Sequence, residues 1–124
     1  MRRMFVSYKQ GQGLVEFAIV LPLFLLLVLL IFDLGRAIYF YSAIHNAVRE
    51  GARYGIVDQN VSRIQNVTRE KAVGLDIDPV VNITSDTVVV TVDYHFSTVT
   101  PLLDRVIGSG ALTLHSRATM YYEK

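Results

Sequence analysis

The hydrophobic pattern of the chain begins with a long apolar segment. Residues 17–32 carry no charge, and Glu16 is the only charged residue when the segment is extended back to Leu14. These roughly nineteen residues would form about 28 Å of helix at 1.5 Å per residue, close to the bilayer hydrocarbon thickness of about 30 Å. The sequence therefore predicts one membrane-spanning helix.

Two residues of this segment are unusual for a passive anchor. Glu16 lies just before the uncharged run, where an ionised carboxylate loses hydration and needs a partner. Pro22 lies inside the predicted helix, where a proline removes a backbone hydrogen bond at a cost of about 3 kcal/mol. An interfacial glutamate and an incidental proline would explain both residues, and so would a helix that later leaves the lipid.

Beyond the span the helical pattern continues to about Ile56. Apolar residues recur there at steps of three and four, which is typical of one face of a helix, and we expect that face to pack on the sheet of a small head. The face comprises Leu34, Ala37, Ile38, Tyr41, Ile44, Val48, Ala52 and Gly55.

A second row on this helix contains only small residues, four apart, which would let another backbone approach closely. It comprises Ala43, Ala47, Gly51 and Gly55. The helix is apolar nearly all round, so one small head cannot cover it, and partner subunits would be suitable neighbours. A strand of the same chain on the small row is the alternative.

A narrow polar wedge remains on the helix, formed by Ser42, Asn46, Arg49, Glu50 and Arg53. Arg49 and Arg53 are four residues apart and repel each other slightly, whereas Glu50 can reach Arg53 at three residues. We interpret these three charges as a structural or inter-subunit salt bridge rather than an anion site.

The rest of the chain predicts a small α+β head. Residues 58–60 have the composition of a turn and helix cap, a second helix follows from Val61, and Gly74 ends it. Strands are expected at 80–85, 88–97 and 111–122, the second with strict apolar and polar alternation typical of a half-buried antiparallel sheet. Residues 100–110 are expected to form a short amphipathic helix on the sheet or on the membrane surface. The overall expectation is a long helix packed on three strands with a short second helix.

Charge predicts the orientation of the span. Arg2, Arg3 and Lys9 precede it with no acidic residue among them, whereas nine basic and ten acidic residues follow from Asp33 onward. Because cytoplasmic flanks favour lysine and arginine, we expect the N-terminus inside and the C-terminus outside. A cleavable secretory signal is the alternative, but the apolar run exceeds the usual length and no small-residue cleavage site follows it.

Composition excludes several chemistries. The chain has no cysteine, so it has no disulfide, thiolate metal site or lipid-modified cysteine. Its net charge of +1 and dispersed basic residues do not favour nucleic-acid binding. His95 and His115 fall on neighbouring predicted strands, but two histidines without a third ligand are weak grounds for a metal site, and His45 is distant in sequence. No nucleophile with a base and no phosphate-binding loop stands out, so we expect no enzyme activity, cofactor or metal.

The motif at the start of the span resembles a known processing site. The segment GQGLVEF at 11–17 is similar to the cleavage region of type IV pilin-like proteins. The longer segments QGLVEFAIVLP and DLGRAIYFYSAIHNAVREGARYG, which extend to residue 55, resemble the TadE-like family of the tight-adherence (Flp) pilus system. The resemblance is specific over residues 11 to about 57 and weak beyond them.

The resemblance implies residue roles. Residues 1–11 would be a leader, cut after Gly11 by a prepilin peptidase, so that Gln12 becomes the new N-terminus and Glu16 the fifth residue. Gly13 is a rival cleavage point, which would leave Glu16 third. The freed amine at Gln12 would lie about one turn from Glu16, and the amine of an adjacent subunit could pair with the same carboxylate. Phe17 and Pro22 complete the assembly motif.

The resemblance also implies a pilin-like fold and function. The expected domains are the leader at 1–11, a transmembrane and stalk helix at 12–57, and an extracytoplasmic head at 58–124. The chain would be a minor pilin or pseudopilin in pilus assembly, secretion and adhesion, located in the inner membrane and then in the surface pilus. Its partners would be the peptidase, other pilins and platform proteins, in a hetero-oligomer. An uncleaved membrane-anchored scaffold or binding protein, and a tethered enzyme with dispersed site residues, are the alternatives.

Overall fold

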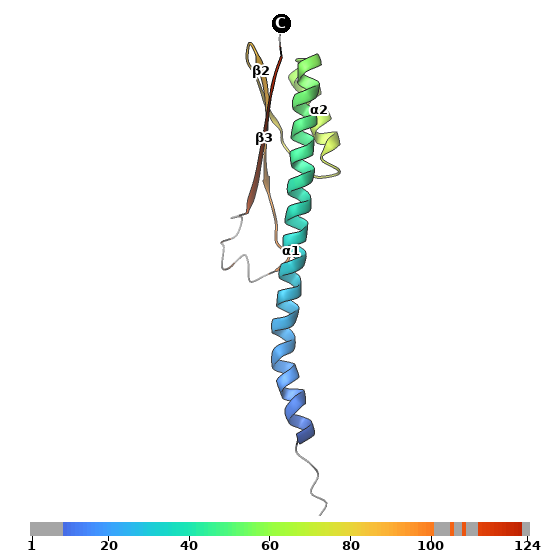
Figure 1. Cartoon of the computed structure of the whole chain (residues 1–124), viewed down its shortest axis with the longest axis vertical. Helices are drawn as coiled ribbons and strands as arrows, with labels where there is room; N and C mark the ends of the chain where they lie inside the picture. Colours follow the sequence, from blue (N-terminus) through green and yellow to red (C-terminus); the bar gives the residue numbers. More distant parts are fainter. Residues whose placement is uncertain (1–8, 101–104, 106–107, 109–111, 123–124) are drawn as a thin grey trace, which may run out of the picture.

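The computed structural model describes residues 9–100, 105, 108 and 112–122. A helix of 49 residues, α1 (Lys9–Val57), forms a stalk that carries a small head at its C-terminal end (Figure 1). The head contains α2 (Val61–Lys71) and the strands β1 (Val80–Ile83), β2 (Thr87–His95) and β3 (Thr113–Tyr121). This is the α+β, pilin-like arrangement that the sequence predicted. The expected helix at 100–110 falls largely outside the described residues.

The long helix is continuous through Pro22, as the sequence analysis expected. The helix ends at a turn that polar side chains stabilise. Asn60 caps α2 by accepting a hydrogen bond from the Arg63 amide at 3.3 Å, and Asp58 accepts one from Arg63 Nη1 at 2.7 Å and one from the Tyr54 hydroxyl at 3.3 Å. These contacts fix the reversal between the two helices.

The turn makes part of the stability depend on pH. The hydrogen bond from Arg63, with a second from the Asn60 amide, holds the pKa of Asp58 below its ordinary value of 3.8 against the opposing effect of desolvation. A carboxylate whose pKa is lowered in the folded state stabilises that state fully when the pH is above the pKa of the unfolded state. This contribution is lost as the pH falls through the pKa of the folded state. Urea unfolding between about pH 5 and about pH 3 should therefore show a shallower loss of stability in Asp58→Asn than in the native chain. Equal slopes would contradict this assignment.

The three strands form one antiparallel sheet in the order β1-β2-β3. Val88 pairs with Ile83 on one side and with Met120 on the other, which sets the register of the whole sheet. The predicted alternation along β2 is confirmed, because Val88, Val90 and Val92 are fully buried while their neighbours face the other side. Gly74, which has a positive φ of 79°, follows the end of α2 as expected.

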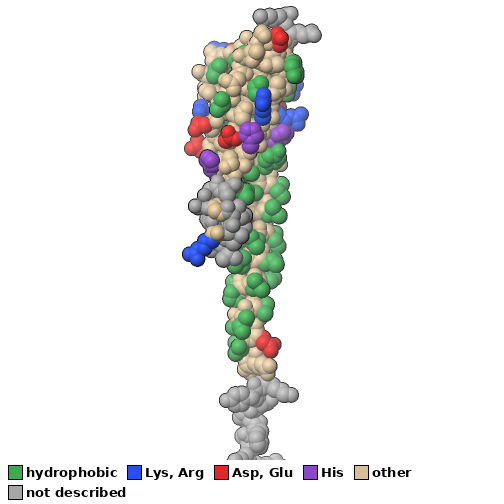
Figure 2. Space-filling model, turned by 90° about the vertical axis from the view of Figure 1, so that its left-hand side faces the viewer, with side chains coloured by type: hydrophobic (Ala, Val, Ile, Leu, Met, Phe, Trp, Pro, Cys, Tyr) green, Lys and Arg blue, Asp and Glu red, His purple; other side chains and the backbone are tan. Residues whose placement is uncertain are grey.

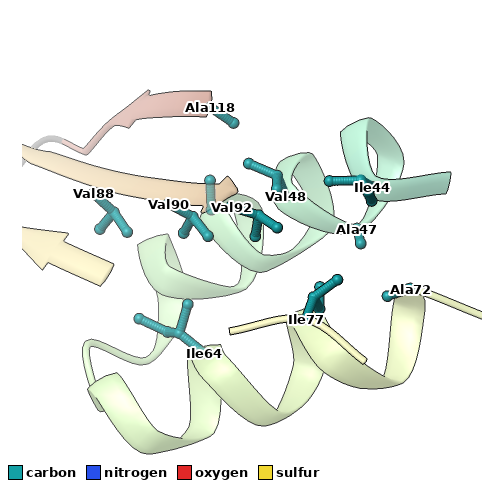
Figure 3. Packing of buried hydrophobic residues seen from close by; sticks show 11 residues of the cluster. Ile44, Ala47, Val48, Ile64, Ala72, Ile77, Val88, Val90, Val92 and Ala118 are labelled. Atoms are coloured by element: carbon teal, nitrogen blue, oxygen red, sulfur yellow. The ribbon is translucent and has the colours of Figure 1, made fainter. Parts of the chain in front are cut away.

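The core lies between the sheet and the two helices (Figure 3). Ile44 and Val48 of α1, Ile64 of α2 and the three valines of β2 are all fully buried. Figure 3 shows these side chains converging on the space between the layers. Because the core includes only the upper part of α1, the head leaves the lower part of the helix uncovered.

The packed face of α1 differs from the predicted one in its lower part. Leu34, Ile38 and Tyr41 are 63%, 60% and 47% exposed, so the expectation that they pack on the sheet was wrong. The buried Asp33 and the half-buried Phe40 take the inward positions at this level. The predicted face lies too far round the helix. It was chosen from apolar residues alone, and this choice left out the inward-facing carboxylate of Asp33.

The row of small residues on α1 is covered by α2 and β2 of the same chain. Ala47, Gly51 and Gly55 are buried and Ala43 is half-buried. A Cβ added at Gly51 would lie 2.0 Å from Thr68 Oγ1, and one at Gly55 would lie 2.7 Å from a Val88 methyl group. The close approach that the row permits therefore takes place within the chain, with α2 at Gly51 and with both strand β2 and α2 at Gly55. The strand that the sequence analysis gave as the alternative is thus one of the two elements on this row.

Gly51→Ala should destabilise the head by roughly 1–3 kcal/mol through overpacking. Thr68 cannot easily move aside, because its hydroxyl is buried and donates to the Ile64 carbonyl at 2.7 Å. Gly35→Ala on the same helix is the control, since a Cβ there meets nothing within 4 Å. Thermal unfolding of the purified chain in detergent measures both, and a Gly51→Ala transition as stable as that of the control would contradict the packing.

Candidate functional site

The lower part of α1 presents its apolar side chains outward. It is long and apolar enough to cross a membrane, and none of its most apolar stretch is buried within the protein. Figure 2 shows apolar side chains over the lower stalk and most of the charged ones on the head. A single N-terminal helix of this kind indicates membrane anchoring.

The residues expected to act in processing and assembly lie on this exposed part. Gly11 has open space around its Cα, Phe17 is 62% exposed, and Pro22 lies within the helix. The Gln12 side-chain amide donates to Glu16 Oε1 at 3.5 Å, so the two residues lie one turn apart on the same side of the helix. A pairing between a freed Gln12 α-amine and the Glu16 carboxylate stays a prediction.

A second polar site, centred on Asp33, lies where the apolar segment ends. Asp33 is only 3% exposed, and its carboxylate accepts hydrogen bonds from the amide of Val99 at 3.0 Å, the amide of Thr100 at 2.8 Å and the Thr100 hydroxyl at 2.6 Å. Arg36 lies one turn on, with Nη1 3.5 Å from Asp33 Oδ1. Three donors and one cation therefore compensate the desolvation of this carboxylate.

An aromatic cluster supports the same junction. The Phe40 ring contacts those of Tyr94 and Phe96 edge-on, with centroids 5.9 and 5.7 Å apart. The Arg36 guanidinium lies 5.5 Å from the Phe40 centroid and 5.4 Å from that of Phe96, within cation–π distance. The segment after β2 is thus attached to the stalk by a carboxylate on one side and by edge-on aromatic contacts on the other.

Sequence reasoning missed this junction. Asp33 was read as the residue at which the apolar run stops, without a role of its own. The signal that could have found it is its place on the helix, because Asp33, Ala37, Ile44 and Val48 recur at four- and seven-residue steps on one face. Its partners, Val99 and Thr100, are more than sixty residues away and show no motif.

The predicted salt bridge on the polar wedge does not form within the chain. Arg49, Glu50 and Arg53 are all exposed, and among the described residues Glu50 forms no ion pair with either arginine. Together with Asn46 and Met120 of β3, they line a groove of about 320 Å³. An inter-subunit bridge from these residues stays a prediction.

The three histidines do not converge. His115 lies opposite Asp93 and bonds to it, His95 pairs with Thr113, and His45 Nδ1 lies 3.2 Å from Ser116 Oγ. Within the described part of the chain, no group of three histidine or carboxylate side chains is placed to hold a metal ion. Each histidine has a different polar partner, which is Ser116 for His45, Thr113 for His95 and Asp93 for His115.

Comparison with known proteins supports one family. The model of the TadE-like protein family matches residues 11–53, which confirms the resemblance expected from the sequence over that segment. The segment includes the exposed span, Asp33 and the whole polar wedge. No curated protein and no solved structure matches the chain. The matched family is associated with tight-adherence pilus systems, and the match covers residues 11–53 of the 124-residue chain.

Proposed function

We propose that this chain is a minor pilin or pseudopilin of a tight-adherence (Flp) pilus system. The observation that carries the proposal is the division of α1 into two parts, an upper part buried by the head and a lower part whose apolar side chains are exposed. In a bilayer, lipid covers the lower part. In a fibre, the same surface would be covered by the helices of neighbouring subunits.

The charge at the start of the helix supports assembly rather than permanent anchoring. After cleavage between Gly11 and Gln12, the new amine lies one turn from Glu16, and an amine of a neighbouring subunit can approach the carboxylate equally well. In a low-dielectric environment the isolated charge is the costly state, so pairing favours subunits that pack in register. Phe17 and Pro22 belong to the same surface, as a large apolar contact and as a site where a neighbour can satisfy a freed carbonyl.

The proposal assigns compartments and partners. Residues 1–11 are a cytoplasmic leader, residues 12–57 the span and stalk, and residues 58–124 a head outside the inner membrane. The partners are a prepilin peptidase, other pilins or pseudopilins, and platform proteins, in a hetero-oligomer that is incorporated into the surface pilus and acts in biogenesis and adhesion. The chain itself performs no catalysis and uses no cofactor.

Leader removal tests this function. Intact-mass and N-terminal peptide measurements on the chain from its own cells should show a mature protein that begins at Gln12 when the prepilin peptidase is present and at Met1 when it is deleted. A mature chain that begins at Leu14 would move the cleavage to Gly13. A chain that keeps residues 1–11 in both strains would overturn the proposal in favour of an uncleaved membrane-anchored scaffold.

A further inference from the structure

Strand β3 is an edge of the sheet. It pairs with β2 on one side, and no described strand pairs with it on the other. Nine residues of edge that no described strand pairs with are a template for a further strand, and proteins usually cover, shorten or charge such an edge. The outward-facing side chains of β3 include Arg117 and His115 but no acid.

The hydrogen-bond pattern identifies the free backbone groups. Phe96 N donates to Leu112 O at 3.0 Å and Tyr122 N to Asp86 O at 3.1 Å, so even-numbered residues on this side of the sheet bond to β2. Antiparallel ladders use every second residue, and the odd-numbered residues therefore direct their N–H and C=O groups to the open edge. These are Thr113, His115, Arg117, Thr119 and Tyr121.

The groove of about 320 Å³ lies between β3 and the stalk. Met120 lines it from the strand, and Asn46, Arg49, Glu50 and Arg53 line it from α1. The two arginines have no carboxylate partner among the described residues. A ligand strand along the edge would therefore run beside two unpaired guanidinium groups, which bind carboxylates well.

We infer that an extended segment of a partner protein adds to the free edge of β3 and places a carboxylate against Arg49 and Arg53. The backbone ladder would supply affinity and the arginines would select an acidic residue in the incoming strand, as in other cases of strand addition. The inference rests on the proposed function in one respect, namely that all subunits have the same orientation in the membrane.

A second copy of this chain fits the edge poorly. Figure 1 shows β2 and β3 running along the stalk, so an antiparallel pair of two β3 strands would need stalks that point in opposite directions. Copies inserted into one membrane with the same topology cannot do this. A parallel pair would bring two sets of Arg49, Arg53 and Arg117 together against only two Glu50 carboxylates, and the remaining like charges are unfavourable there. The occupant is therefore a different protein.

Site-specific photocross-linking tests the inference. The full chain, carrying p-benzoylphenylalanine in place of the 78% exposed Tyr121, is irradiated in its own cells. We expect an adduct with a different protein, cross-linked within an extended segment that contains Asp or Glu. Thr119→Pro removes one edge N–H without touching the bonds to β2, and it should weaken the adduct about fivefold because one backbone hydrogen bond is lost. Thr119→Val keeps the N–H and should leave the adduct unchanged.

The remaining outcomes are equally decisive. Arg49→Glu combined with Arg53→Glu should weaken the adduct without altering the sheet, and this pair of changes serves if the proline variant fails to fold. No adduct, an adduct of twice the mass of the chain, a cross-linked segment without an acid, or an adduct indifferent to both changes would overturn the inference. If the mature chain begins at Gln12 but forms no adduct, the inference fails and the proposed function stands. If an uncleaved chain forms the adduct, the proposed function fails and the inference stands.

Discussion

Replacing Asp33 with alanine is expected to detach the segment after β2 from the stalk and to lower the free energy of unfolding by roughly 3 kcal/mol or more. The Thr100 amide and hydroxyl are buried, and both lose the carboxylate that accepts their hydrogen bonds. Each buried donor left without an acceptor costs about 1–3 kcal/mol. Urea unfolding of the purified chain in detergent measures the change.

Two variants show whether the loss comes from this contact. Asp33→Asn keeps one acceptor oxygen and should cost less than Asp33→Ala. Asp76→Ala removes an exposed carboxylate of the same head and should change stability by less than about 0.5 kcal/mol. If Asp33→Ala unfolds at the same urea concentration as Asp76→Ala, the carboxylate does not hold the junction.

Glu16→Ala is expected to leave membrane insertion intact and to abolish most co-assembly with partner pilins. The substitution makes the span more apolar, so insertion is not penalised. In an assembled bundle it leaves the amine of a mature N-terminus buried without a partner, which costs about 3–5 kcal/mol when one member of a buried pair is removed. Recovery of the chain with partner pilins should fall by more than an order of magnitude.

The comparison for this prediction is a glutamate outside the span. Glu70→Ala changes an exposed residue of α2 and should leave recovery with partner pilins unchanged. Membrane fractionation of both variants checks insertion. Normal recovery of Glu16→Ala in these complexes would show that the carboxylate has no part in subunit pairing.

Local patterns predicted most of the fold. The charge-free run defined the exposed span, the alternation along β2 defined its buried face, and Asn60 and Gly74 marked the ends of α2. Each of these signals depends on residues close together in sequence, where helix period, strand period and capping chemistry act directly. The resemblance to the TadE-like family over residues 11 to about 57 is matched by the family model over residues 11–53.

Long-range contacts were beyond the reach of these patterns. The small residues Gly51 and Gly55 predicted that another element packs closely against α1. They did not show which element, because a glycine leaves room for any of them. Asp33 and Thr100 lie 67 residues apart, and neither has a distinguishing neighbourhood in sequence. The inward-facing carboxylate also displaced the predicted apolar stripe, so one unrecognised hydrogen-bonded site accounts for two differences from the structure.

The most direct test of the account asks what covers the lower part of α1. A photo-reactive residue in place of Ile19, which is 72% exposed, is irradiated in cells with and without the secretion ATPase of the pilus system. We expect adducts with other pilins that depend on the ATPase, because assembly replaces lipid by neighbouring helices. Cross-links to lipid alone, equal in both strains, would show that the helix stays in the membrane and would contradict the account.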